Sequence, residues 1–408
     1  MQDKKRFEDQ IVIYVTGEDR PGIMADFLRI FDHPSCQIVD IDQMVVYKKL
    51  FMAITIRYLS DETEAHRDIL KEVLYRAKQI GVRVDFDIDK SSSFEGEKSG
   101  KSEELIVTAV SESLSNGALA KISHCLSDHG CNIIKIKKLN KGLLSVIEIK
   151  TSAPESLKPD KLRADLFFLG DQHKFDVAMQ LDSVFRKQKR LVVFDMDSTL
   201  IEQEVIDELA RTAGVYDKVK AITEEAMQGK LNFEESLRKR VSMLKGTPET
   251  VFDDVFEKLI YSKDVIFLSK ALKKLGYKLA VISGGFTHVI DKAKEKLGFD
   301  YGYANTMEVK DGLMTGDVTG EIITPERKAE LLLAICNEHG ITRDQVIAVG
   351  DGANDQLMLN AAGMGIAYKA KPALKESASY RINYKSLASI LFFLGIDEQE
   401  AETLIENT

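Results

Sequence analysis

The chain contains no tryptophan and only four cysteines and seven prolines among its 408 residues. The cysteines are scattered, without a CxxC pair or a zinc-like spacing, so they predict free thiols in a reducing compartment rather than disulfides or zinc. Long apolar runs are also missing. No run reaches the length of a membrane-spanning helix, and the first ten residues lack the apolar centre of a signal peptide. These absences predict a cytoplasmic protein without a membrane anchor.

An excess of positive charge is missing as well. Lys and Arg total 56 against 65 Asp and Glu, which gives a formal net charge of −9. A general nucleic-acid binder would show a basic face, so we expect no nucleic-acid partner. An anionic small molecule remains a possible ligand, because a metal ion or a few local cations can capture it. The remaining composition is typical of a globular protein with two or three domains.

Two polar stretches divide the chain into three parts. Residues 89–104 are rich in serine, glycine and charge, as in a flexible linker. The short basic run RKQKR, residues 186–190, precedes a strongly apolar strand, and we expect a solvated connector there. The predicted domains are 8–90, 103–182 and 188–400.

The first two parts share one order of elements. Each has an apolar strand, a turn and a helix, then two strands, a second helix and a last strand. This βαββαβ pattern predicts an α+β, ferredoxin-like unit. A glycine between the first strand and the helix, Gly22 or Gly117, would let backbone N–H groups approach a carboxylate at the helix N-terminus.

The turn GEDRPGIMADF, residues 17–27, resembles the opening of an ACT domain, a small module that commonly binds amino acids. The second part resembles it more weakly, because Asn116–Gly117 stands where the first has Pro21–Gly22. The resemblance implies that at least one copy binds an amino-acid effector. The alternative is that both glycines only shape their turns.

From residue 191 onward, short apolar strands alternate with helices. Such continuous runs are expected of parallel strands that are covered on both faces. Three of the strands end in Asp195, Ser283 and Asp351. Because open parallel sheets place their ligands at the carboxyl ends of the strands, these side chains should converge. The pattern predicts an α/β, Rossmann-like core.

The motif FDMDSTL carries the sharpest chemical signal. Asp195 and Asp197 are two residues apart, so both carboxylates can face one side of an extended chain. They repel each other and need a cation to stay ionised. Asp351 and Asp355 in GDGANDQ add acidic oxygens at another strand end. Oxygen ligands without His or Cys favour Mg²⁺ over zinc, so the set predicts metal-assisted phosphoryl transfer.

Residues 191–370 resemble the haloacid dehalogenase superfamily of phosphatases, with four motifs in order: DMDST, the serine of ISGG, Lys328 and GDGAND. The match continues in the helical segment after the first motif. Four of its residues fall where phosphoserine phosphatases carry substrate residues: Glu204, Met227, Phe233 and Arg240. The whole chain resembles the longer form of that family, with tandem ACT modules. Gln356 departs from the pattern, since the family usually has an apolar residue there.

The resemblance implies roles for the four aspartates. Asp195 would attack phosphorus, and Asp197 would protonate the leaving oxygen and then activate water. Mg²⁺ would be held by Asp195, the Asp197 carbonyl oxygen and Asp351. Asp355 would lie behind these ligands and orient a bound water.

The resemblance also implies a set of phosphoryl-binding groups. Ser283 and the Gly284 backbone N–H would hydrogen-bond phosphoryl oxygens, and Lys328 would add a positive charge. Asn354 would fix the loop or Lys328. Outside the four-motif pattern, Lys328 would be a solvated helix lysine and Asn354 a plain turn residue.

Residues 202–268 read as four helices and imply a mobile cap that excludes water. Glu204 would bind the substrate ammonium, Arg240 its carboxylate, and Met227 and Phe233 its apolar side. In the alternative, Arg240 is solvated and the apolar pair is cap core. The segment 303–320 reads as a β-hairpin.

The resulting hypothesis is a phosphatase that hydrolyses O-phospho-L-serine in the last step of serine biosynthesis, with an amino acid such as serine as effector. One alternative is a phosphotransferase that passes the phosphoryl group to another alcohol, such as homoserine. Another is a catalytically inactive amino-acid sensor, which the intact Asp195, Asp197 and Asp351 disfavour. ACT-like sheets often pair edge to edge, so we expect a homodimer.

Overall fold

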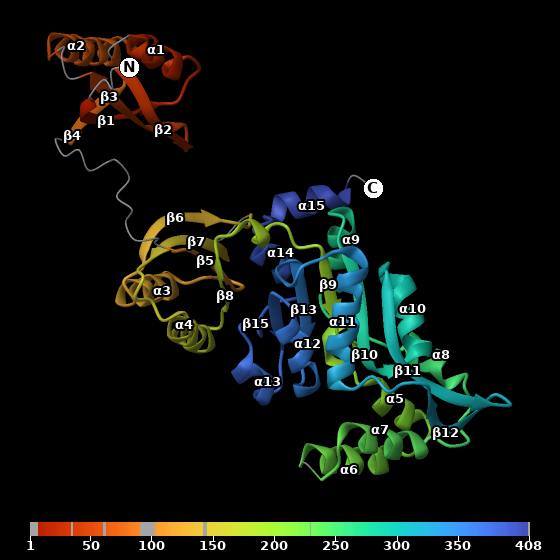
Figure 1. Cartoon of the computed structure of the whole chain (residues 1–408). Helices are drawn as coiled ribbons and strands as arrows, with labels where there is room; N and C mark the ends of the chain where they lie inside the picture. The colour runs from red at the N-terminus through yellow and green to blue at the C-terminus, as the bar shows by residue number, and fades with distance from the viewer. Residues whose placement is uncertain are drawn as a thin grey trace, which may run out of the picture. The chain divides into compact units, whose positions relative to one another are not determined.

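The computed structural model describes residues 7–33, 36–59, 63–89, 103–141, 145–228 and 230–406. Figure 1 shows the chain, which divides into two compact units, up to Lys101 and from Ser102. Residues 90–102, which hold most of the predicted linker, lie outside the described part, as does the side chain of Met227. None of the described helices is long and apolar enough to span a bilayer.

The first unit has the predicted βαββαβ fold. Its elements are β1 (Phe7–Glu18), α1 (Ile23–Phe31), β2 (Cys36–Val46), β3 (Lys49–Leu59), α2 (Thr63–Ile80) and β4 (Arg83–Asp89). The strands lie in the order β2-β3-β1-β4, and all neighbours are antiparallel. Both helices cover one face of the sheet (Figure 1). Alternate residues such as Ile13 and Ile54 form the core with Phe27 of α1.

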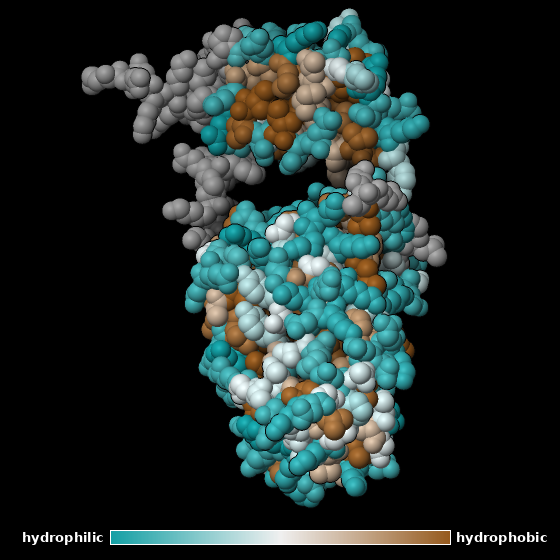
Figure 2. All heavy atoms as spheres, turned by 90° about the vertical axis from the view of Figure 1, so that its right-hand side faces the viewer, coloured by the Kyte–Doolittle hydropathy of each residue, from teal (hydrophilic) through white to brown (hydrophobic). Residues whose placement is uncertain are grey.

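The other face of this sheet is open among the described residues. Tyr14, Met44 and Phe51 are exposed, and the strand register puts them on the side away from the helices. Tyr47, in the turn between β2 and β3, is 98% exposed. Figure 2 shows apolar side chains gathered on the surface of this unit, in the upper part of the view.

The second ACT-like domain repeats this topology. It comprises β5 (Glu103–Val110), α3 (Asn116–Asp128), β6 (Asn132–Lys138), β7 (Val146–Ala153), α4 (Pro159–His173) and β8 (Asp176–Leu181). Its antiparallel order, β6-β7-β5-β8, is that of the first sheet.

The two helix starts differ, however. Gly22 precedes α1 with a left-handed φ of 97°, which suits glycine. Gly117 instead lies inside α3, and Ser115 caps that helix by accepting the Ala118 N–H at 3.1 Å. The expectation of a glycine between strand and helix is therefore wrong for the second copy, because a serine begins its helix.

The third sheet is the Rossmann-like core that the strand pattern predicts. Its strands are β9 (Leu191–Phe194), β10 (Lys278–Phe286), β11 (Tyr301–Lys310), β12 (Leu313–Thr319), β13 (Val346–Gly350), β14 (Met364–Tyr368) and β15 (Tyr380–Ile382). They lie in the order β12-β11-β10-β9-β13-β14-β15, parallel except for β12, which forms the predicted hairpin with β11.

Helices cover both faces of this sheet, which explains the unbroken apolar strands. Val192 and Phe194 belong to the same core cluster as residues of α9 (Val265–Lys274) and α10 (Thr287–Leu297). Leu191 and Val193 face the other way, toward α11 (Pro325–His339) and α12 (Gln356–Ala361). Every side chain of β9 is thus buried.

The four cap helices form as predicted: α5 (Val205–Thr212), α6 (Tyr216–Met227), α7 (Phe233–Ser242) and α8 (Val251–Glu257). The chain leaves and re-enters the core at one point, where the Glu202 N–H donates to the Ile260 carbonyl at 2.9 Å. Because α9 begins at Val265, residues 265–268 belong to a core helix instead of the cap.

Elements after β14 join the second ACT-like domain to the core: α13 (Pro372–Ser377), β15, α14 (Ser389–Phe393) and α15 (Glu398–Glu406). The core thus extends past residue 400. Arg186 is buried, donates to the Phe393 carbonyl at 3.2 Å and pairs with Glu148. The expected solvated connector at 186–190 is wrong for Arg186, because its guanidinium anchors the junction.

Candidate active site

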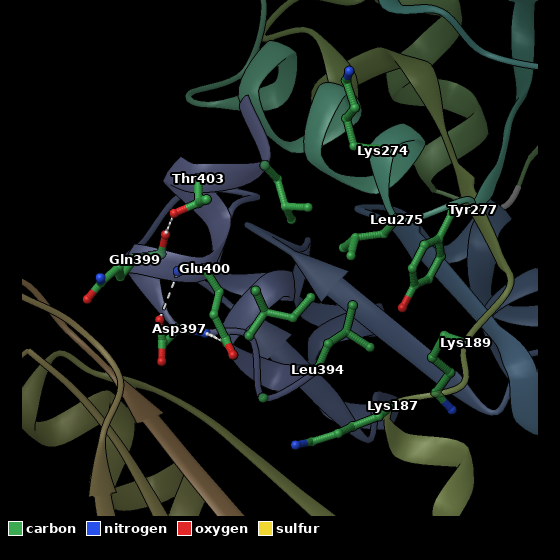
Figure 3. A pocket seen from close by; sticks show the side chains of 13 residues that line it. Lys187, Lys189, Lys274, Leu275, Tyr277, Leu394, Asp397, Gln399, Glu400 and Thr403 are labelled. Atoms are coloured by element: carbon green, nitrogen blue, oxygen red, sulfur yellow. Dashed lines mark hydrogen bonds between the residues drawn. The ribbon is translucent and has the colours of Figure 1, made fainter. Parts of the chain in front are cut away.

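A cavity of about 860 Å³ lies at the amino ends of the core strands, just before β10 and beside α15 (Figure 3). Lysines and apolar side chains line it. Its two carboxylates, Asp397 and Glu400, each accept the other's backbone N–H at the start of α15. Ligands of open parallel sheets bind at the opposite, carboxyl edge, so size does not make this cavity the catalytic site.

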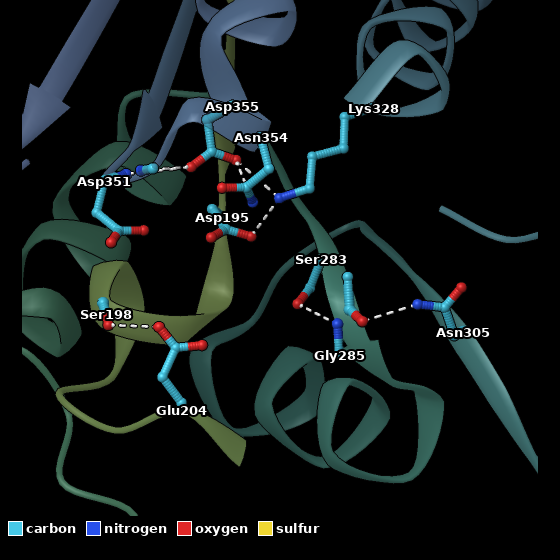
Figure 4. A network of polar contacts seen from close by, with 12 residues as sticks. Asp195, Ser198, Glu204, Ser283, Gly285, Asn305, Lys328, Asp351, Asn354 and Asp355 are labelled. Atoms are coloured by element: carbon cyan, nitrogen blue, oxygen red, sulfur yellow. Dashed lines mark hydrogen bonds and ion pairs between the residues drawn. The ribbon is translucent and has the colours of Figure 1, made fainter. Parts of the chain in front are cut away.

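A smaller cavity, about 80 Å³, lies at the carboxyl edge. Asp195 follows β9, Ser283 lies within β10 and Asp351 follows β13, and all three line it, as the strand ends predict. Figure 4 shows these side chains turned toward one another. The Asp195 N–H donates to the Val349 carbonyl at 2.9 Å, which fixes β9 against β13 at the edge of the site.

Lys328 on α11 lies at the centre of this network. Its ammonium is 2.6 Å from Asp195 Oδ1 and 2.7 Å from Asp355 Oδ1. Burial lowers the pKa of Lys328, but the two carboxylates outweigh it and raise the pKa overall, so the side chain stays charged. At 0% exposure, Lys328 is not a solvated helix lysine.

The GDGAND turn orients Asp355 behind the cavity. Asp355 Oδ2 accepts the N–H groups of Asp351 and Gly352, each at 3.1 Å, while Oδ1 pairs with Lys328. Asn354 Nδ2 also approaches Oδ1, at 3.4 Å. A Cβ at Gly350 would come within 2.5 Å of the Asp355 carboxyl, so only glycine leaves room for it.

Three buried carboxylates gather closely enough to share a cation. One oxygen each from Asp195, Asp351 and Asp355 lies within 4.8 Å of the others. Burial raises the pKa of Asp195 to about 8, with Asp355 adding repulsion, and burial raises the pKa of Asp351 to about 6. A cation would hold these groups ionised, and the all-oxygen donor set is compatible with a hard divalent metal.

Asp197 lies in a turn that departs from helical geometry. Ser198 has a left-handed φ of 57°, which is uncommon for a residue other than glycine. Burial first, and then Glu204 and Asp195, raise the pKa of Asp197 well above its usual value. Its Oδ1 is buried and has no hydrogen-bond partner within the described structure. A raised pKa favours the protonated form of a carboxyl, which is the form that can donate a proton.

Cap residues close the cavity from the other side. Glu204 precedes α5 and accepts a hydrogen bond from the Ser198 hydroxyl at 3.1 Å. Arg240 on α7 lines the same cavity; burial lowers its pKa, against the opposing effect of Glu204 and Asp207. Arg240 is therefore not on a solvated face. Phe233 also lines the cavity, while the Met227 side chain lies outside the described residues.

The loop after Ser283 is held by a residue that the sequence did not single out. Ser283 Oγ accepts the Gly285 N–H at 2.9 Å. Asn305 Nδ2 donates to the Gly284 carbonyl at 2.7 Å, and its Oδ1 accepts the Ile323 N–H at 2.8 Å. A Cβ at Gly284 would lie 2.9 Å from the Phe233 ring, which accounts for glycine there.

Lys371 is a second residue that sequence reasoning missed. It lines the cavity, and its ammonium is 3.1 Å from Asp351 Oδ2 and 3.4 Å from Glu204 Oε1. The signal was present, because Lys371 follows the strand GIAY, and the carboxyl ends of the other core strands had already been used to find the site.

Comparisons with known proteins agree with this architecture. The chain matches the model of haloacid dehalogenase-like hydrolases over residues 192–360 and that of the ACT domain over residues 9–87. A phosphoserine phosphatase of Streptomyces coelicolor is 35% identical over 392 residues, which cover 96% of this chain and 93% of that protein. One of Methanocaldococcus jannaschii is 49% identical over 208 residues, 51% of this chain and 99% of that protein.

A solved structure extends the agreement to three dimensions. The probable phosphoserine phosphatase of Vibrio cholerae, in its unliganded form, superposes with a TM-score of 0.59 at 31% identity. The match covers 76% of this chain and 90% of that one.

The parallel core, its helical cap and the cluster of strand-end aspartates define a haloacid dehalogenase-like hydrolase that carries an ACT domain. The sequence similarity to phosphoserine phosphatases extends over nearly the whole chain and identifies one family within this class of hydrolases. The chain belongs to the phosphoserine phosphatase family. These relatives are named for phosphatase activity, which favours neither a phosphotransferase nor an inactive sensor.

Proposed function

We propose that this protein hydrolyses O-phospho-L-serine to L-serine and phosphate through a phosphoryl intermediate on Asp195, with Mg²⁺ as cofactor. One observation carries the proposal: Asp195, ion-paired to a fully buried Lys328, lines the same small cavity as Glu204 and Arg240 of the cap. A phosphate and an amino-acid zwitterion can then be bound in one place.

Asp195 is the nucleophile. Lys328 holds its Oδ1 at 2.6 Å, which leaves Oδ2 for attack on phosphorus. As the Asp195–phosphorus bond forms and the ester bond breaks, Asp197 gives its proton to the departing serine oxygen. Asp197 then takes a proton from the water that releases phosphate. The raised pKa of Asp197 supports the first of these steps.

The remaining groups stabilise the charge on the phosphoryl oxygens. Ser283, the Gly284 N–H and Lys328 bind these oxygens, and Asn354 steadies the loop. Asp195, the Asp197 carbonyl oxygen and Asp351 would hold Mg²⁺, which supplies further positive charge there when bound. Asp355 would lie behind these ligands and orient a bound water, and its position is fixed by Lys328 and two backbone N–H groups.

Residues of the cap bind the amino-acid part of the substrate. Glu204 binds the ammonium, and Arg240 binds the carboxylate through its planar fork. Phe233 lines the apolar side, and Met227 is assigned there by the family resemblance alone. The opposite charges of Glu204 and Arg240 in one cavity suit a zwitterion better than a sugar or a nucleotide.

The ACT domain supports regulation by an amino acid such as serine. The start of α1 after Gly22 has no capping side chain, so its N–H groups can meet a carboxylate. Gly117 lacks this support, since Ser115 caps α3. The open apolar face with Tyr14, Met44 and Phe51 favours a homodimer. The four free cysteines fit the reducing cytoplasm.

Phosphate release from a panel of phosphomonoesters, with Mg²⁺ and then with EDTA, tests the proposal. We expect L-phosphoserine to be hydrolysed far faster than sugar, nucleotide and phosphothreonine esters, and EDTA to abolish the activity. The Asp195→Asn variant is the control and should release no phosphate. A preference for another ester would overturn the roles of Glu204 and Arg240. Activity of the control variant would overturn that of Asp195.

A further inference from the structure

The short helix α13 touches the active site at one end and the second ACT-like domain at the other. Lys371, which precedes α13, pairs with Asp351 at 3.1 Å and Glu204 at 3.4 Å. Lys375, one helical turn later, pairs with Asp171 of α4 at 3.0 Å. Four helical residues span only about 6 Å, so little structure separates the two contacts.

Packing makes α13 a stiff connection rather than a loose one. Leu374, between the two lysines, is buried in the core cluster that includes Met358 and Leu359. The helix also contacts the turn Ala353–Asp355, which belongs to the GDGAND motif and carries Asp355. The Lys371 N–H donates to the Asp351 carbonyl at 2.9 Å, so Lys371 holds Asp351 by backbone and side chain together. A shift of α13 therefore moves Asp351.

Asp171 is well placed to anchor the far end. Its Oδ1 accepts a hydrogen bond from the Tyr384 hydroxyl at 3.1 Å in addition to the Lys375 pair. Tyr384 follows β15, and its backbone N–H donates to Asp176 of β8. The second ACT-like domain thus contacts α13 and the segment that follows it.

We propose that Lys371 is a positioning residue, which pairs with Asp351 and Glu204 in the free enzyme. Because α13 links Lys371 to the second ACT-like domain, the strength of these two ion pairs depends on that domain. The inference rests on the proposed function, which identifies Mg²⁺ and the substrate ammonium as the cations that these two carboxylates bind. A lysine ammonium between them competes with any cation that they would take. Mg²⁺ at Asp351 and the substrate ammonium at Glu204 are the two competitors.

Calorimetric titration of the full-length protein with Mg²⁺ alone tests the connection. Lys371→Met should tighten Mg²⁺ binding about two- to fivefold, since a partly exposed ion pair contributes little more than that. Lys375→Met should shift the affinity in the same direction by a smaller factor. The double variant should bind no more tightly than Lys371→Met, because both changes act through one side chain.

The matched control is Lys137→Met. Lys137 also joins the second ACT-like domain to the core, through Asp397 at 3.4 Å, but Asp397 lies just before α15 and away from α13. Its loss should leave Mg²⁺ affinity unchanged. The proposal is overturned if Lys375→Met matches this control, or if its effect persists in the Lys371→Met background.

Kinetics with phosphoserine separate this idea from the proposed function. Lys371→Met should lower KM more than it changes kcat, because the variant frees Glu204 without touching Asp195. The Mg²⁺ titration needs no substrate. If the unaltered protein prefers another ester, the proposed function fails while the Mg²⁺ results still decide the role of α13.

Discussion

Lys328 explains how two acidic side chains, Asp195 and Asp355, can be buried side by side. Burying a charged group costs several kcal/mol unless partners satisfy it. Here the ammonium lies 2.6 Å from Asp195 and 2.7 Å from Asp355, and Asp355 also accepts two backbone hydrogen bonds. The charges compensate one another, so removal of one member leaves the others exposed to the full cost of burial.

Lys328→Met should therefore damage both activity and stability. We expect kcat/KM for phosphoserine to fall at least about 100-fold, the usual cost of losing a charge-stabilising donor. The free energy of unfolding should drop by about 3–5 kcal/mol, because Asp195 and Asp355 lose a buried partner. Steady-state kinetics and denaturant unfolding measure the two effects.

Arg327 provides the neighbouring control. It pairs with Glu321 and Glu330 at the surface, and Arg327→Met should change kcat/KM by less than about twofold. Near-normal turnover of Lys328→Met would mean that Asp195 needs no lysine beside it.

Helix α7 carries two arginines, Arg238 and Arg240, that lie in different surroundings. Arg240 lines the cavity, whereas Arg238 pairs with Glu234 and Asp317 on the outside of the cap. Residues two apart on a helix face different ways, so the same substitution can be compared at both positions.

Arg240→Ala should hurt phosphoserine far more than an aryl phosphate that lacks an amino-acid carboxylate. A charged hydrogen bond contributes about 1.5–3 kcal/mol, which corresponds to about a 10- to 150-fold loss in kcat/KM for phosphoserine. For p-nitrophenyl phosphate the loss should stay within a few-fold. Arg238→Ala should affect neither substrate. Equal losses on both substrates would show that Arg240 does not read the carboxylate.

Much of the core could be predicted because its signals are local. Asp195 and Asp351 each follow a continuous apolar run, and the cap helices carry a clear periodicity. Lys371 and Asn305 were missed for different reasons. Lys371 was missed because the segment after GIAY has no helical periodicity that would predict α13. Asn305 was missed because it is an uncharged residue inside a strand. Arg186 was taken for a solvated charge because the structure that buries it, α14, lies more than 200 residues later.

On the scale of the whole molecule, the second ACT-like domain and the hydrolase core share a polar junction. Asp176 at the start of β8 is its most buried acid. It accepts backbone N–H groups from Asn383, Tyr384 and Lys385 at 2.6–3.1 Å. Burial outweighs these donors and raises the pKa of Asp176 from 3.8 to about 6.

The raised pKa of Asp176 predicts that the stability of the protein falls as the pH rises. Between about pH 4 and pH 6 the native state binds the Asp176 proton more tightly than the unfolded state does. Stability from this group is thus fully present only below the unfolded pKa of 3.8, and it is lost as pH rises through about 6. The pKa difference corresponds to about 3 kcal/mol.

Asp176→Asn should remove this pH dependence. We expect the wild-type unfolding free energy, relative to the variant, to fall by about 2.4 kcal/mol between pH 4 and pH 7 in denaturant titrations. Asp160→Asn, which removes an exposed carboxylate on α4, is the control for the loss of a surface acid. A difference for Asp176→Asn that does not change with pH would mean that water reaches the junction, because burial is what raises the pKa of Asp176.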